Sequence, residues 1–285
     1  MEVDPGVAPT ELLRVRGGEV APCTDLLATE EPLEIRLEGP DRVVGQVAVT
    51  MRTPGHDLEL AVGFLYTEGL LRGRQELGQP PVRTLVPHTA GHVLTVRLQV
   101  PFDAARLRRN FYATSSCGIC GKASIDQVEQ SAPPVAPGPM VPQRTILGLP
   151  GALRAAQRVF AHTGGLHATG LFDAGGRLLV LREDVGRHNA VDKVVGCALL
   201  GDMLPLSRHV MMVSGRLSFE IVQKAAMAAV PILCAVSAPS SLAVQAAQRL
   251  GLTLVGFVRG DSFNVYTHPE RLVLDAAGSE QGEPG

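Results

Sequence analysis

The 285-residue sequence has no tryptophan, few other aromatic residues and almost no net charge. Aromatic residues make up 4% of the chain and hydrophobic residues 45%, which predicts a sizeable core built from Val, Leu, Ala and Ile. The formal net charge is −2, and this balance argues against broad nucleic-acid binding. We therefore expect no nucleic-acid partner.

Long apolar runs and an export signal are also missing from the sequence. The most apolar stretch, AAMAAVPILCAVSA, is shorter than the roughly 18 residues of a membrane-spanning helix, and Pro231 interrupts it. The first residues, MEVDPGVAPTELL, are acidic and lack the apolar segment of a secretory signal. The expectation is a soluble, cytoplasmic protein with no membrane partner.

Cysteine is scarce, with five residues in the chain. An odd number of cysteines without an export signal predicts free thiols rather than structural disulfides. Cys197 lies in the predicted helix VDKVVGCALL and Cys234 in the predicted strand PILCAV, where both suit small buried side chains. Cys117 and Cys120, in the stretch ATSSCGICGKASID, are the pair suited to chemistry.

The N-terminal part predicts a small α+β unit. Residues 1–28 show no clear pattern and predict a loose start. Residues 32–51 alternate apolar and polar side chains on both sides of GPD, which predicts a β-hairpin, and residues 82–100 predict a second hairpin that turns at TAGH. Between them, residues 53–71 predict a helix that Thr53 caps, with Pro54 in its first turn.

The C-terminal half alternates predicted helices and apolar strands. A helix is predicted over 145–162 and two strands over 166–183, turned at DAGG. Further helices are predicted from Asn189, over 218–230 and over 241–251, and further strands over 209–214, 231–237 and 252–258. This rhythm predicts βαβ units and a largely parallel sheet covered on both faces.

A Pro-rich run, SAPPVAPGPMVPQ, separates the two halves and predicts a linker or surface loop. The predicted organisation is an N-terminal α+β unit over 1–115, a CxxC loop and linker over 116–143, and an α/β/α cofactor-binding domain over 144–285.

Polar segments follow four predicted strands, at 183–189, 214–218, 237–241 and 259–264. Ligands of open α/β sheets bind beyond the carboxyl ends of the strands. Two of the segments, SGRLS and SAPSS, also precede predicted helices, whose free N–H groups favour anions. An anionic ligand such as a nucleotide is one interpretation, and ordinary capped βα turns are the other.

The residues alone leave three readings of the CxxC pair open. A structural zinc site usually needs four ligands, and no second CxxC exists. A thioredoxin-type disulfide would follow a first strand, whereas this pair precedes a Pro-rich loop. A nucleophilic thiolate, favoured by Lys122 nearby, would take sulfur from a donor persulfide and release it to a soft metal.

Several ordered motifs resemble the formate dehydrogenase accessory sulfurtransferase family (FdhD). The resemblance spans about residue 30 to residue 273. It rests on TPGHDLELAVGFLYTEGLL, SSCGICGKASID, HTGGLHATGLF, EDVGRHNAVDKVVG, SGRLSFEIVQKAAMA, APSSLAVQAA and GFVRGDSFNVYTHPERL.

The resemblance implies a function and a set of partners. The family carries sulfur from a cysteine desulfurase to the molybdenum cofactor, molybdenum bound by two molybdopterin guanine dinucleotides, for formate dehydrogenase. Its persulfide carrier falls on Cys117 and its second cysteine on Cys120. The resemblance further implies a homodimer, and a C-terminal three-layer α/β/α core like that of cytidine deaminases.

The family's cofactor-binding segment falls on FVRGDS, one of the polar segments above. Its residues are Phe257, Val258, Arg259, Gly260, Asp261 and Ser262.

Among the remaining polar residues, Ser214 and Arg216 are predicted to contact phosphate, for which a hydroxyl and a guanidinium fork are suited. For His167 and His188, a role in the ligand pocket and a purely structural role are equally good interpretations.

Asp192 and Lys193 lie inside a predicted helix and are assigned a structural role. Arg106, Arg108 and Arg109 suit a docking patch or, more simply, a solvated helix face.

Two alternative functions remain. A zinc deaminase needs H-x-E together with P-C-x-x-C. Only His268 is followed by Glu two residues later, and Ser116 rather than Pro precedes Cys117, so the signature is incomplete and no bound metal is predicted. A chaperone that binds the cofactor without transferring sulfur is the other alternative.

Overall fold

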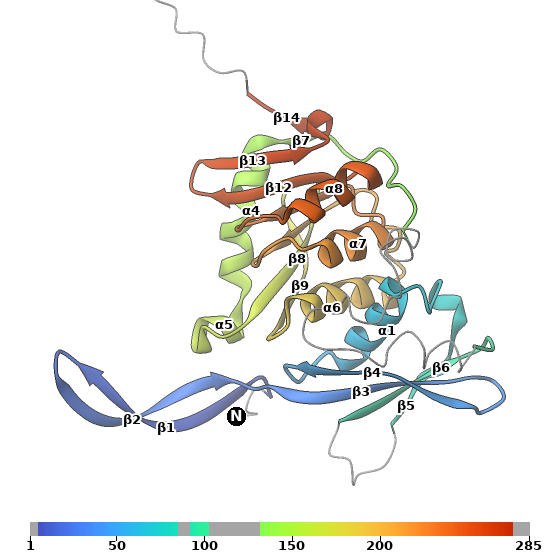
Figure 1. Cartoon of the computed structure of the whole chain (residues 1–285), viewed down its shortest axis with the longest axis horizontal. Helices are drawn as coiled ribbons and strands as arrows, with labels where there is room; N and C mark the ends of the chain where they lie inside the picture. The colour runs from blue at the N-terminus through green and yellow to red at the C-terminus, as the bar shows by residue number, and fades with distance from the viewer. Residues whose placement is uncertain (1–4, 85–91, 103–131, 276–285) are drawn as a thin grey trace, which may run out of the picture.

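Figure 1 shows the computed structural model of the chain, which describes residues 5–84, 92–102 and 132–275. Cys117, Cys120 and the three arginines Arg106, Arg108 and Arg109 lie outside the described residues. Their predicted roles therefore stay predictions.

A six-stranded sheet of order β13-β12-β11-β10-β8-β9 forms the centre of the C-terminal half. Its strands are β8 (His167–Asp173), β9 (Leu178–Asp184), β10 (His209–Val213), β11 (Ile232–Ala235), β12 (Thr253–Arg259) and β13 (Ser262–Thr267). Strands β10, β11 and β12 are parallel, whereas β8, β9 and β13 pair in antiparallel fashion. The prediction of a largely parallel sheet thus holds for the direction of β9, β10, β11 and β12 and is wrong for β8 and β13, because two hairpins reverse the chain without a crossover helix.

Helices cover both faces of this sheet. On one face lie α6 (Arg187–Leu200), α7 (Phe219–Met227) and α8 (Ser241–Leu250), and on the other lies α4 (Gln143–Ala156). Side chains alternate along each strand, so Met211 packs in the first cluster and Met212 in the second. This gives the predicted three-layer order of helix, sheet and helix.

Smaller elements complete the C-terminal half. Helix α5 (Arg158–Thr163) follows α4 after Gln157, so the single helix predicted over 145–162 is broken in two. The short strands β7 (Val141–Pro142) and β14 (Leu272–Val273) pair beside η3 (Pro269–Arg271). No helix in the described ranges is both long and apolar enough to cross a membrane.

The N-terminal half contains a four-stranded sheet of order β4-β3-β6-β5. Its elements are β3 (Glu31–Glu38), β4 (Val44–Arg52), α1 (Asp57–Thr67), η1 (Arg74–Glu76), β5 (Leu77–Thr84) and β6 (Val93–Leu98). The strands of both predicted hairpins are confirmed as the antiparallel pairs β3–β4 and β5–β6, while most of the predicted TAGH turn lies outside the described residues. Helix α1 covers one face of the sheet, where Leu60 and Leu65 pack with Ile35 and Val96.

The loose start predicted for residues 1–28 is wrong. Strands β1 (Val7–Arg16) and β2 (Glu19–Ala28) form a hairpin that reaches away from the rest of the molecule (Figure 1). It turns at Gly17 and Gly18, whose positive φ angles of 58° and 90° suit glycine. Apolar residues on this hairpin stay exposed, so its sequence lacks the clean alternation of a strand with one buried face.

Two glycines let α1 and α6 cross with their backbones in contact. A Cβ on Gly196 would lie 1.8 Å from the Glu59 carbonyl oxygen, and a Cβ on Gly63 would lie 1.8 Å from the Asp192 carbonyl oxygen. Any side chain at either position would force the helices apart. This reciprocal contact fixes the N-terminal half on the helical layer of the C-terminal half.

Substitution of Gly196 with alanine should destabilise the protein, although alanine is the better helix former. We expect a loss of about 1–3 kcal/mol in the free energy of unfolding, the usual cost of overpacking. Urea unfolding followed by circular dichroism measures this change.

Gly151 offers a matched control, because it lies exposed in α4 and a Cβ there would meet nothing within 4 Å. Gly151→Ala should stabilise the protein by up to about 1 kcal/mol. Equal effects of the two substitutions would show that the α1–α6 contact does not constrain the fold.

Candidate functional site

Four strand ends and two strand starts share an edge of the central sheet. Strands β9 to β12 end there, and the antiparallel β8 and β13 begin there. The pairing of His167 with Asp184, the last residue of β9, shows the arrangement directly. The four polar segments predicted to leave the strand ends therefore do gather at one edge, which we call the carboxyl edge.

Backbone hydrogen bonds hold the segments after β10 and β11 side by side. The N–H of Leu217 donates to Ala238, and the N–H of Ser240 donates to Leu217, at 3.1 and 2.9 Å. Ser240 also caps α8, because its Oγ accepts from the N–H of Ala243 at 3.2 Å. These segments are pre-formed rather than free loops.

Ser214 joins this edge to β8. Its Oγ accepts from the N–H of Ala168 at 2.8 Å, and its own N–H donates to the Ala168 carbonyl at 2.9 Å. The Oγ thus positions the start of β8, while its hydroxyl hydrogen stays able to donate. Arg216, two residues later, is exposed.

Two histidines lie on the same edge. Burial lowers the pKa of His167, and the charges of Arg187 and Arg216 lower it further. Burial, followed by the charges of Lys224 and Arg187, lowers the pKa of His188 to about 3. Both imidazoles are therefore neutral at neutral pH, when each can donate one hydrogen bond and accept another.

His188 faces the start of α7. Its Nε2 lies 3.3 Å from the Oγ of Ser218 and 3.8 Å from a carboxylate oxygen of Glu220. Because both partners meet the same ring nitrogen, this group lacks the two-sided contact of a Ser-His-acid triad.

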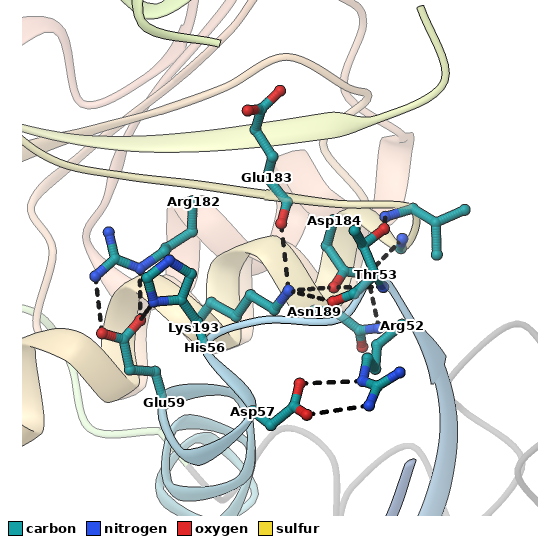
Figure 2. A network of polar contacts seen from close by, with 12 residues as sticks. Arg52, Thr53, His56, Asp57, Glu59, Arg182, Glu183, Asp184, Asn189 and Lys193 are labelled. Atoms are coloured by element: carbon teal, nitrogen blue, oxygen red, sulfur yellow. Dashed lines mark hydrogen bonds and ion pairs between the residues drawn. The ribbon is translucent and has the colours of Figure 1, made fainter. Parts of the chain in front are cut away.

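A buried network holds the turn between β9 and α6 (Figure 2). The Asp184 carboxylate is fully buried and lies 2.7 Å from the Lys193 ammonium. It also accepts hydrogen bonds from the N–H groups of Gly186 and Thr53 and from the Asn189 amide, at 2.8, 3.2 and 3.0 Å. Asp184 thereby shapes the turn that carries Arg187 and His188.

Thr53 belongs to this network and does not cap a helix, contrary to the prediction. Helix α1 begins at Asp57, with His56 at the N-cap position. The Thr53 Oγ1 accepts from the N–H of Val185 at 3.2 Å, and its carbonyl accepts from Lys193 at 2.9 Å. The structural role predicted for Lys193 agrees with this geometry.

Ion pairs flank the network on both sides (Figure 2). Arg52 donates to both carboxylate oxygens of Asp57 at 3.0 Å. Arg182 of β9 pairs with Glu59 of α1 through its Nη2 at 2.7 Å. Burial alone would raise the pKa of Glu59, but hydrogen bonds from Arg182 and His56 outweigh it and lower the pKa to about 2. Glu59 therefore stays ionised.

A second buried ion pair links α1, α6 and α7. Lys224 donates to both oxygens of Asp192 at 3.0 Å and to the hydroxyl of Thr67 at 2.9 Å. Burial lowers the pKa of Lys224, but the carboxylates of Asp192 and Glu68 outweigh it and raise the pKa above its ordinary value. Lys224 thus remains a cation beside His188, and the structural role predicted for Asp192 also agrees.

The segment FVRGDS forms the tip of the β12–β13 hairpin. Phe257 has a positive φ of 54° at a register shift between the two strands, and its N–H donates to Ser237 at 3.2 Å. The Arg259 guanidinium lies 5.0 Å from the centre of the Phe257 ring. Val258 is buried, whereas residues 259–262 are exposed.

Residues 259–264 were expected to form a loop, yet β12 continues to Arg259 and β13 begins at Ser262. Gly260, with a φ of 59°, makes the turn between them, and Asp261 follows at the tip. The tight hairpin places the Asp261 carboxylate in solvent at the carboxyl edge.

The predicted site residues fall into two groups. Ser214 and Arg216 lie beside His167, near β8. The hairpin lies at β12, two strands from β10 and three strands from β8, or about 10 to 14 Å at the usual strand spacing. Nowhere in the described ranges do three His, Cys, Asp or Glu side chains meet as a metal site would require.

Comparison with known proteins identifies relatives over nearly the whole chain. The model of the FdhD/NarQ family matches residues 28–273. Sulfur carrier protein FdhD of Streptomyces avermitilis is 51% identical over 282 residues, which cover 95% of this chain and 97% of the relative. The Mycobacterium tuberculosis protein of the same name is 49% identical, over 87% of this chain and 92% of its own length.

A solved structure has the same fold. It is the crystal structure of a protein assigned as a formate dehydrogenase accessory protein from Desulfotalea psychrophila, with a TM-score of 0.72 and 28% identity. The match covers 94% of this chain and 100% of that chain. With a family model matched from residue 28 to residue 273 and half of all positions shared with relatives, the chain belongs to the FdhD/NarQ family.

Proposed function

We propose that this protein is a sulfurtransferase that serves the molybdenum cofactor of formate dehydrogenase. A cysteine desulfurase supplies the sulfur, and Cys117 carries it as a persulfide. The acceptor is molybdenum bound by two molybdopterin guanine dinucleotides. The observation that carries this proposal is the similarity, over nearly the whole chain, to proteins named sulfur carrier protein FdhD.

The first chemical step is an exchange between sulfur atoms. The Cys117 thiolate attacks the outer sulfur of the donor persulfide, and the donor's S–S bond breaks as its own thiolate leaves. No external oxidant or reductant is needed for this exchange. One cysteine is therefore enough to load the sulfur, with Cys120 as an auxiliary thiol.

The acceptor would bind at the carboxyl edge. The Asp261 carboxylate, exposed at the hairpin tip, can accept hydrogen bonds from the N1–H and amino group of guanine. Arg259 lies beside it and can pair with phosphate or stack on a base. Two identical chains in a homodimer would meet the two guanosine ends, and the C-terminal core would resemble that of cytidine deaminases.

Replacement of Cys117 with alanine should abolish sulfur loading. After incubation with a desulfurase and cysteine, intact-mass spectrometry should show a gain of about one sulfur atom in the unmodified protein and in Cys120→Ala. Cys117→Ala should show no gain and should not activate formate dehydrogenase, while GDP still binds. A Cys117→Ala protein that activates the enzyme normally would instead favour a cofactor chaperone.

Recognition of guanine should depend on Asp261. In calorimetric titration GDP should bind more tightly than ADP, because adenine lacks the N1–H and amino donors that a carboxylate accepts. Asp261→Ala should remove most of this preference, at a cost of about 1.5–3 kcal/mol for GDP. Asp41→Ala, in the exposed β3–β4 turn, is the control and should change neither affinity. Equal affinities for GDP and ADP in the unmodified protein would refute guanine recognition.

A further inference from the structure

Two nitrogen-bearing side chains, those of His167 and Arg187, lie close to Gly215 on the carboxyl edge. A Cβ on Gly215 would lie 3.3 Å from Nδ1 of His167 and 3.8 Å from Cβ of Arg187. Arg216 follows Gly215 directly in the chain. The three side chains come from the start of β8, the start of α6 and the segment after β10, so the fold rather than local sequence brings them together.

The charge at this place is positive. Both Arg187 and Arg216 act on His167, and Arg187 and Lys224 act on His188. The buried carboxylate that acts on His167, that of Asp184, is already paired with Lys193 at 2.7 Å. Within the described part of the chain, the Nε of Arg187 is buried and has no hydrogen-bond partner.

The start of α6 adds to this unbalanced charge. Gly186 occupies the N-cap position, and among the described residues no side chain caps the helix. The first turn contains Arg187 and His188 and no acidic residue. A cation at the positive end of a helix dipole is unfavourable by itself, and a buried N–H without a partner adds to the cost. An anion bound there would relieve both.

We propose that Arg187, His167 and Arg216 form an anion subsite that binds the phosphate groups of the guanine dinucleotide. The guanidinium of Arg187 offers paired N–H donors, neutral His167 offers one more, and Arg216 adds charge at the exposed rim. This inference rests on the proposed function for the identity of the ligand. It separates phosphate binding near β8 from base recognition at the β12–β13 hairpin, about 14 Å away at the usual strand spacing.

Calorimetric titration with GDP, guanosine and inorganic pyrophosphate tests the subsite. Arg187→Ala should weaken binding of GDP and pyrophosphate at least tenfold and leave the affinity for guanosine unchanged. Arg208→Ala is the matched control, since Arg208 is an exposed arginine at the opposite edge of the same sheet, next to the start of β10. It should leave all three affinities unchanged.

Two further variants keep the test decisive. Arg187→Lys keeps the charge and loses the fork, so it should recover part of the pyrophosphate affinity. If Arg187→Ala unfolds at a lower urea concentration, Arg216→Ala replaces it, with the same expected direction for GDP and pyrophosphate. Unchanged GDP and pyrophosphate affinities in the folded arginine variants would overturn the proposal, as would a failure of the unmodified protein to bind either.

The pyrophosphate measurement is independent of sulfur transfer. Pyrophosphate binding that depends on Arg187, without a preference for GDP over ADP, would support the anion subsite and count against the guanine dinucleotide as its ligand. The result for sulfur transfer in Cys117→Ala neither supports nor contradicts the anion subsite.

Discussion

The contact between the backbones of α1 and α6 is the constraint on which the arrangement of the carboxyl edge depends. Gly63 faces the carbonyl group of Asp192 and Gly196 faces that of Glu59, so the two helices cross with no room for a side chain between their backbones. This crossing brings the chain just before α1 to the turn just before α6. Thr53, from the N-terminal half, can then hydrogen-bond with Asp184 and Val185, in the turn that carries Arg187.

Buried ion pairs allow only one arrangement of the segments that meet where α1 packs on α6. The pairs Asp184–Lys193 and Asp192–Lys224 are almost fully removed from water, and the cost of desolvating such pairs offsets much of their attraction. These pairs select one geometry more than they add stability, because any arrangement that separates the partners would leave an uncompensated charge in the core. Lys224 also acts on the carboxyl edge directly, since its charge helps to keep His188 neutral.

Local patterns in the sequence predicted most elements of the fold. The alternation around GPD, the turn at DAGG and the apolar strands of the C-terminal half all correspond to observed elements, because each depends on contacts close in sequence. Thr53 was misassigned because its partners lie more than 130 residues away. Strand β13 was missed because its alternation follows a polar, glycine-containing segment that resembles a loop.

In the candidate site, too, only the features that depend on local sequence could be predicted. The polar segments at the strand ends could be predicted, since parallel strands bring their carboxyl ends to one edge. The grouping of His167 with Arg216 could not, because it requires β8 to pair antiparallel with β10, so that the first residue of β8 lies where β10 ends. The roles of Cys117 and Cys120 stay predictions from motif and family.

A mixed sheet has a consequence for the chemistry of this edge. Parallel strands deliver loops and helix N-termini to the edge, and these supply backbone N–H groups. The antiparallel strands β8 and β13 instead begin there, and a strand start presents a side chain held in a fixed direction by its ladder. His167 is such a position, and Ser262, next to Asp261 at the hairpin tip, is the corresponding position on the other side of the parallel strands. The edge thereby combines backbone N–H groups in the middle with side chains from two strand starts at its flanks, an arrangement that would suit a long ligand with a base at one end and phosphates further along.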